Sequence, residues 1–475
     1  MMALLPKLPP VPLPGPRAVP FFGADGNLVR FYMAPLRFTT RLHRRYGPVA
    51  AFAENDPAMV SAFEPEHMRQ VLSDPASFHN MESLPLRMPE GSSLRRASRG
   101  LTMINDDLHR RHRRLMLPAF QKTAIDGYRG SIIATAERSL AQLRPGQTVD
   151  VSRALRELTA RIAVSCFFGL DAGPRAERMS AVGAELHEGM TSPLAMLLPF
   201  DLPGTRFASL SRSFETVEGW IRELIREKRA RPESGNDALA LMIRARDDDG
   251  GSFTDEDLLS EAVLLFVAGY ETTAYTLVWT LFLLSQHPAV LADLRDELRG
   301  TSPRALTTAE VGAGLPLLDA VIKETMRLLT VTPFLIFRFA QQPFQLGPYE
   351  LPQGAGVLLC PFLTHRKPDL YPEPSRFLPS RWGSIRPSSY EYLPFGAGPR
   401  TCLGASFANA AVRILLPMVL ERATFELEPE ARVDLRLRGI TLGPSGSLPM
   451  RLRPPGDLPR RVRVRGDVCE SVSFD

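Results

Sequence analysis

The most informative segment of the 475-residue chain lies near its C-terminus and reads Phe395-Gly396-Ala397-Gly398-Pro399-Arg400-Thr401-Cys402-Leu403-Gly404. An apolar run with helical spacing, Ala405 to Leu420, follows it. Cys402 therefore falls where a glycine-rich loop meets the start of a helix. Glycine lets backbone approach a flat ligand closely, and the positive end of a helix favours a thiolate over a thiol. The pattern predicts a sulfur presented to a metal, with Arg400 placed to meet an anionic group or to stabilise the thiolate. A buried structural cysteine beside a tight turn is the alternative.

A second apolar stretch, Thr254 to Ser285, has the length and the start of a long central helix. Thr254 fits an N-cap because acidic residues fill the turn that follows it. At the rise of an α-helix the stretch would span roughly 48 Å, enough to cross a whole domain. Glu261 and Glu271 interrupt the apolar run, so a buried central helix is favoured over a transmembrane one.

The middle of that stretch carries small and polar residues where a flat ligand would need room. Leu265, Ala268, Gly269 and Thr272 fall on one helical face. A threonine in mid-helix can bond back to the backbone and bend it. Burying the acid at Glu271 is costly unless it has a function or a partner. A structural threonine and a salt-bridged glutamate are the alternative reading.

The segment Asp106 to Phe120 predicts a short, very basic helix that ends near Pro118. His109 and Arg113 are four residues apart and so share one face. Arg110 and Arg114 form a second row that is turned away from the first. On the residues alone, a solvated basic helix explains this pattern as well as a binding surface does.

Two further features are weaker when taken singly. Glu324 and Arg327 lie three residues apart on a predicted helix, Leu318 to Leu329, which is a common arrangement of an ion pair. Downstream, Arg381 lies in a proline-containing segment, and Pro333 to Arg338 is predicted to form a strand.

The loop around Cys402 resembles the haem-binding loop of the cytochrome P450 monooxygenases. The family pattern is Phe, two residues, Gly, one residue, Arg, one residue, Cys, one residue, Gly. It is matched at Phe395, Gly398, Arg400, Cys402 and Gly404. The segment Ala268 to Thr273 resembles the oxygen-binding helix of the same family, and the resemblance covers roughly residues 15–453. It implies a mainly α (α+β) fold, a helical body with a small β-rich region and one buried haem b (iron protoporphyrin IX).

The resemblance also implies a role for each matched residue. Cys402 would be the axial ligand of the haem iron, as the thiolate that favours O–O cleavage. Thr272 and Glu271 would deliver protons, and Glu324, Arg327 and Arg381 would lock the cysteine loop. The remaining positions would surround the haem and the substrate: His109, Arg113, Arg338 and Arg400 at the propionates, Phe395, Gly398, Ala268 and Gly269 at the haem, and Leu265, Phe334 and Leu335 in the substrate pocket.

Composition limits the other classes of function. The net charge is +5, yet the basic residues are scattered and no nucleic-acid-binding motif accompanies them. The four cysteines form no CxxC pair, so neither a zinc site nor a disulfide framework is expected. The N-terminus shows no apolar run of about 20 residues, so we expect no membrane anchor, a cytoplasmic location and a monomer.

The expected organisation is a proline-rich arm (1–24), one haem-thiolate domain (25–453) and a disordered basic tail (454–475). Residues 31–46 are predicted to form a helix, and Val49 to Phe63 a hairpin. Residues 81–101 are predicted to be a long loop that caps the substrate pocket, and Met190 to Phe207 an apolar lid above it.

The implied reaction is the insertion of one atom of O₂ into a C–H or C=C bond of a small apolar molecule such as a lipid, terpenoid or polyketide-like compound. No flavin- or nicotinamide-binding fingerprint is visible, so a ferredoxin or flavodoxin with its NAD(P)H reductase is expected to supply the electrons. A peroxygenase driven by hydrogen peroxide is one alternative, and the Glu271–Thr272 pair argues against it. A haem-thiolate sensor or binding protein without turnover is the other.

Overall fold

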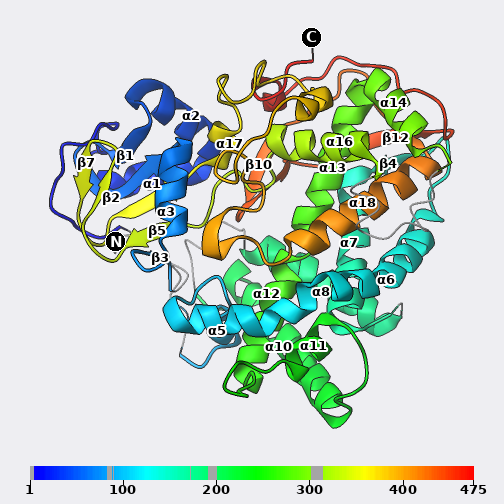
Figure 1. Cartoon of the computed structure of the whole chain (residues 1–475), viewed down its shortest axis with the longest axis horizontal. Helices are drawn as coiled ribbons and strands as arrows, with labels where there is room; N and C mark the ends of the chain where they lie inside the picture. Colours follow the sequence, from blue (N-terminus) through cyan, green and yellow to red (C-terminus); the bar gives the residue numbers. More distant parts are fainter. Residues whose placement is uncertain are drawn as a thin grey trace.

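A β-rich region and a larger helical body make up this computed structural model, which describes residues 5–82, 88, 90–171, 173–190, 200–300 and 314–474 (Figure 1). The expected mainly α fold is confirmed. The helices are α1 (Gly23–Met33), α2 (Pro35–Tyr46), α3 (Pro65–Ser73), α4 (Ser93–Ala97), α5 (Asp106–Met116), α6 (Lys122–Leu140), α7 (Val151–Phe168), α8 (Pro174–Met190), α10 (Arg206–Ala230), α11 (Ala238–Arg244), α12 (Asp255–Ala268), α13 (Glu271–Gln286), α14 (Pro288–Leu298), α16 (Pro316–Leu328), α17 (Pro361–Thr364) and α18 (Ala405–Arg422).

The largest sheet has the strand order β1-β2-β8-β5-β3. Only β2 and β8 pair in parallel within it, and Asn80 of β3 lies opposite Arg338 of β5. Smaller sheets have the orders β4-β12-β9, β10-β11 and β6-β7. The strands are β1 (Val49–Ala53), β2 (Asp56–Ala62), β3 (Phe78–Asn80), β4 (Thr148–Asp150), β5 (Arg338–Ala340), β6 (Phe344–Leu346), β7 (Tyr349–Leu351), β8 (Gly356–Leu359), β9 (Thr424–Leu427), β10 (Leu435–Arg438), β11 (Thr441–Pro444) and β12 (Pro449–Arg453).

The predicted central helix is present but is divided into α12 and α13. Its start is fixed by a capping box, in which Thr254 and Asp257 each accept a hydrogen bond from the other's backbone N–H. Gly269 and Tyr270 separate the two helices. Among the described residues, Asp255–Gln286 is the one stretch with the length and composition to cross a membrane, and 67% of its most apolar part is buried within the protein.

The chain termini and two predicted loops differ from expectation. The arm is docked, because Leu13 is buried and the Pro14 carbonyl accepts a hydrogen bond from Ala51 N–H. The tail, expected to be disordered, packs against the core through Val468 and Val472, which are 0% and 2% exposed. The predicted loop 81–101 contains α4, and within the predicted lid residues 191–199 lie outside the described part of the chain.

Candidate haem and substrate site

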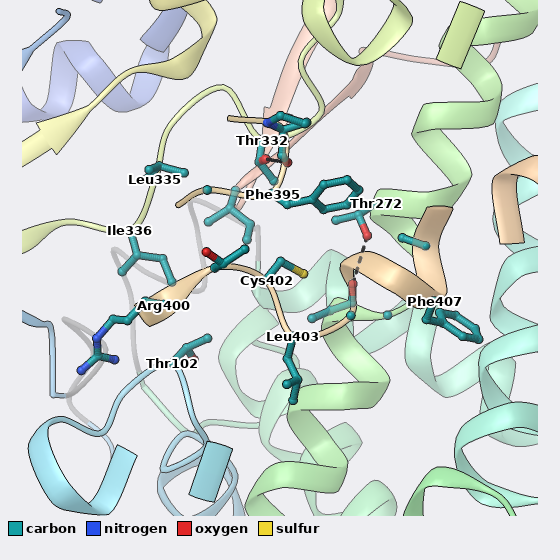
Figure 2. Close-up of a pocket in the computed structure, with 18 of the residues that line it drawn as sticks. Thr102, Thr272, Thr332, Leu335, Ile336, Phe395, Arg400, Cys402, Leu403 and Phe407 are labelled. Carbon is teal, nitrogen blue, oxygen red and sulfur yellow. Dashed lines mark hydrogen bonds between the residues drawn. The ribbon is translucent and has the colours of Figure 1, made fainter. Parts of the chain in front are cut away.

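A cavity of about 300 Å³ separates the Cys402 loop from the α12–α13 pair, and its lining is mostly apolar. The Cys402 side chain points from the loop into this space, opposite the helix that carries Thr272 (Figure 2). Most of the predicted site residues line the cavity: Leu265, Ala268, Gly269, Thr272, His109, Arg113, Phe334, Leu335, Arg338, Phe395, Arg400 and Cys402. The sequence motifs, which are far apart along the chain, therefore meet at one place.

The cysteine loop is shaped by glycines in backbone conformations that other residues adopt only with strain. Gly398 has a φ of 73°, and a Cβ there would lie 2.1 Å from the Leu72 carbonyl oxygen of α3. The backbone N–H of Cys402 donates to the Phe395 carbonyl at 2.9 Å, which closes the turn before α18 begins at Ala405. Burial raises the pKa of the Cys402 thiol, while the Gly404 N–H and the Arg113 guanidinium oppose that rise. A metal bound at the sulfur would remove the thiol proton.

Cationic side chains gather at one end of the cavity. Burial and the charges of Arg400, Arg113 and Arg338 lower the pKa of His109 to about 4. Burial and Arg400 lower the pKa of Arg338 to about 9. Burial lowers the pKa of Arg400 to about 10, with Arg113 adding to the effect and Asp106 opposing it. Neighbouring positive charges disfavour one another, and an anion bound between these groups would stabilise their charged forms.

The fit to haem follows from this chemistry. The cavity offers a cysteine sulfur on one face, a cationic end suited to two carboxylates, and apolar walls suited to a porphyrin ring. The buried Nε of Arg400 has no hydrogen-bond partner in the described residues, although its other nitrogens bond to Ile104 O at 3.0 Å and Asn105 Oδ1 at 2.6 Å. Arg113 donates to Thr401 O at 2.9 Å, which ties α5 to the cysteine loop.

The break between α12 and α13 opens onto the cavity. Gly269 lies against Phe167, where a Cβ would approach the ring to 2.4 Å. The Thr272 hydroxyl donates to the Ala268 carbonyl at 3.2 Å (Figure 2). Thr276 in turn donates to Thr272 O at 2.9 Å. Both threonines thus bond back to the helix that they belong to, with Thr272 at the cavity wall.

Glu271 is positioned differently from its neighbour. Its side chain is fully buried and does not line the cavity. One carboxylate oxygen lies 4.0 Å from a guanidinium nitrogen of Arg156 on α7. The negative charge of Glu271 also helps to raise the pKa of Tyr270 and of Tyr275. The sequence places Glu271 next to Thr272, but the helix turns the two side chains to different sides.

The predicted lock is formed. Glu324 Oε1 accepts from Arg327 at 2.8 Å and from Arg381 at 3.0 Å, and all three side chains are buried. Trp382, which the sequence did not single out, adds an N–H bond to Glu324 Oε2 at 3.1 Å. Arg327 also binds the His365 carbonyl at 2.9 Å. The helix α16 is thereby tied to the segment that precedes the cysteine loop.

Several cavity residues carried no signal in the sequence. Thr332 and Ile336, from the segment around Leu335, line the cavity, as do Thr102 and Ile440. Figure 2 shows Thr102, Thr332 and Ile336 around the Cys402 loop. Ile336 belongs to the segment Pro333 to Arg338, which was predicted to be a strand but enters one (β5) only at Arg338. Thr102, Thr332 and Ile440 lie outside any motif, so only the fold brings them to the cavity.

The arginines that α5 turns away from the cavity have acidic partners in the structure. Arg110 is ion-paired with Asp107, and Arg114 with Asp248. Arg111 binds Asp247 at 2.7 Å. A carboxylate therefore accompanies each of these three arginines.

Comparison with known proteins agrees with the geometry. The family model described as Cytochrome P450 matches residues 13–448. The chain is 30% identical over 451 residues to the putative cytochrome P450 135B1 of Mycobacterium tuberculosis, covering 93% of this chain and 91% of that protein. It is 29% identical to the cyclooctat-9-en-7-ol 5-monooxygenase of Streptomyces melanosporofaciens, covering 92% and 94%. The structure of a retinoic acid-bound cyanobacterial CYP120A1 superposes with a TM-score of 0.80 at 24% identity, covering 94% and 99%. The chain belongs to the cytochrome P450 family of haem b-dependent monooxygenases.

Proposed function

We propose that this monooxygenase hydroxylates or epoxidises a small apolar molecule of the lipid, terpenoid or polyketide-like type. The observation that carries the proposal is the apolar lining of the cavity, where Leu264 and Leu265 of α12, together with Phe334, Leu335 and Ile440, offer hydrocarbon surface. Such walls bind apolar ligands and give little to a sugar or a nucleotide. The relative named for acting on cyclooctat-9-en-7-ol supports the terpenoid class.

In this proposal Cys402 is the thiolate that binds the haem iron. Gly398, which was expected at the haem, does not line the cavity and instead shapes the cysteine loop by packing against Leu72. His109, Arg113, Arg338 and Arg400 neutralise the propionates, which supply the anion that their lowered pKa values call for. Phe395, Ala268 and Gly269 form the walls on either side. When bound, haem supplies the iron that activates O₂ for transfer of one oxygen atom.

The proposed proton donor on the cavity side is Thr272, because its hydroxyl lies at the wall and can exchange its bond to Ala268 O for one to a ligand. Glu271 is proposed to act from the other side of the helix, where one of its carboxylate oxygens lies 4.0 Å from Arg156. The interruption at Gly269–Tyr270 lies directly before both residues.

A ferredoxin or flavodoxin with its NAD(P)H reductase is proposed to supply the electrons. The protein is proposed to act in the cytoplasm as a monomer. The paired arginines on α5 do not by themselves favour a docking site there. The steering of an acidic donor would depend on the summed charge of the surface around the cysteine loop.

The test combines a binding screen with turnover. Apolar compounds that displace water from the iron should change the Soret absorbance, and the best of them should be consumed with NADH in the presence of a ferredoxin and its reductase. One oxygen atom from ¹⁸O₂ should appear in the product. Binding without turnover under these conditions would contradict the proposal and favour a sensor, while turnover only with hydrogen peroxide would favour a peroxygenase.

A further inference from the structure

A buried carboxylate, Glu261, connects three walls of the cavity without lining it. Glu261 lies on α12 and is 0% exposed. Its Oε1 is 2.8 Å from His112 Nδ1 on α5, and its Oε2 accepts a hydrogen bond from the Leu101 N–H at 3.0 Å. Burial raises the pKa of Glu261, and its bonds to His112 and Leu101 oppose that rise. One side chain therefore holds an element and a loop that are far from it in sequence.

The loop held by Glu261 forms part of the cavity. Leu101 and Thr102 both line it, next to Leu264 of α12. The loop also packs closely against α12: a Cβ on Gly100 would lie 3.1 Å from Ser260 O and 3.2 Å from Leu264 Cβ. On its other side the Thr102 carbonyl accepts a bond from Asn80 at 2.9 Å. Glu261 is thus the hydrogen-bonding anchor that fixes this loop against the helix.

The second partner, His112, belongs to the helix that carries the cationic end of the cavity. It follows His109 by three residues and directly precedes Arg113. The His112 ring is 2% exposed and stands edge-on to Phe253 at 5.0 Å. The other nitrogen of its ring lies 3.7 Å from Asp257. A shift of His112 would carry His109 and Arg113 with it, because all three share one rigid helix.

We propose that Glu261 is a positioning residue: by holding the Leu101–Thr102 loop and α5 against α12, it sets the width of the cavity on its substrate side. The proposal rests on the proposed haem site and goes beyond it, since no motif of the family loop includes Glu261, His112 or Leu101. A single buried hydrogen bond between side chains adds little net stability. Its effect here is to fix two separate walls of the cavity relative to a third.

The test compares two nitrogen ligands that bind haem iron in the holoprotein. Imidazole reaches the iron and touches little else, whereas phenylimidazole also contacts the cavity walls. Glu261→Leu removes both acceptors and leaves the Leu101 N–H and the His112 ring without them. We expect it to weaken phenylimidazole binding about fivefold relative to imidazole, the effect of losing one or two hydrogen bonds. Glu261→Gln keeps an oxygen for Leu101 and should restore most of the ratio.

A matched control separates positioning from general destabilisation. Glu218 on α10 is also buried and ion-paired, with Arg96 at 2.8 Å and Arg222 at 2.8 Å, but neither Glu218 nor these two arginines line the cavity. Glu218→Leu should lower the melting temperature and leave the ratio of the two affinities unchanged. If Glu261→Leu behaves in the same way as Glu218→Leu, Glu261 only stabilises the fold and the proposal is wrong.

A second variant covers the case in which Glu261→Leu does not fold. Gly100→Ala leaves Glu261 intact and pushes the same loop away from α12, so the affinity ratio should move in the same direction. Amide hydrogen exchange at Leu101 should become faster in Gly100→Ala and stay at the parental rate in Glu218→Leu. An unchanged ratio and unchanged exchange would overturn the proposal. If the parent protein itself shows no spectral shift with either ligand, the haem site fails instead, and the exchange rates alone decide the role of Glu261.

Discussion

Replacing Glu324 with glutamine should destabilise the protein far more than a change of one atom suggests. The Glu324 carboxylate accepts five hydrogen bonds, from Arg327 Nε and Nη2, Leu378 N, Arg381 Nε and Trp382 Nε1, at 2.8 to 3.1 Å. Arg327 is fully buried, and Arg381 is 7% exposed. Glutamine keeps one acceptor oxygen and turns an NH₂ group toward donors, so two buried guanidinium groups lose their counter-charge.

Removing one partner of a buried ion pair costs about 3–5 kcal/mol. We expect Glu324→Gln to lower the free energy of unfolding by about that amount. The segment Leu378–Trp382 lies just before the cysteine loop, so the same change should also reduce the haem content of the purified protein. Guanidinium unfolding followed by far-UV circular dichroism, with haem measured per chain, gives both quantities.

The control is an ion pair with the same spacing on the surface. Glu373 and Arg376 are also three residues apart, but their side chains are 55% and 46% exposed. Glu373→Gln should cost at most about 1 kcal/mol, because solvent screens exposed pairs. If Glu324→Gln costs no more than Glu373→Gln and retains full haem, the lock does not hold the cysteine loop and the reasoning fails.

Three further outcomes follow from the site. Thr272→Ala should keep haem and ligand binding but divert electrons to peroxide, and an unchanged ratio of product to NADH would contradict the role of the hydroxyl. In the haem-free protein, the pKa of His109 is about 4 against an ordinary 6.5. As the pH falls from 6.5 to 4, residue 109 of the parent protein binds a proton in the unfolded chain but not in the folded one. The free energy of unfolding should therefore fall by about 3 kcal/mol less in His109→Gln than in the parent over this range. Equal losses in both proteins would show that His109 titrates normally. Because Asp107 and Asp248 neutralise arginines of α5, replacing both by asparagine should speed reduction by an acidic ferredoxin at low salt and not at high salt. If the variant and the parent are reduced at the same rate at low salt as well as at high salt, the donor docks elsewhere.

Local motifs were predictable because their geometry is set within a few residues. The turn that presents Cys402 depends on Gly398 with its positive φ, and the start of α12 depends on Thr254 and Asp257. The pairing of Glu324 with Arg327 follows from helical spacing alone. Each of these could be read from the sequence before any long-range contact was known.

Long-range pairing was not predictable in the same way. Asp247 and Asp248 neutralise Arg111 and Arg114, which lie more than 130 residues away in the sequence. No pattern near either segment predicts this pairing. The tail was expected to be disordered because it is basic, but its few apolar residues, such as Val468, pack into the core. Helical spacing predicts that Glu271 and Thr272 face different sides, but the approach of Glu271 to Arg156 of α7 at 4.0 Å could not be read from the sequence.

The central claim is that Cys402 is the thiolate that binds the haem iron. The most direct measurement is the absorbance spectrum of the reduced, CO-bound holoprotein, for the parent and for Cys402→Ala at equal haem content. The parent should show the strongly red-shifted Soret band of a thiolate-ligated haem, and the variant should show a band at the shorter wavelength of haem without a thiolate. A red-shifted band that persists in Cys402→Ala would contradict the account.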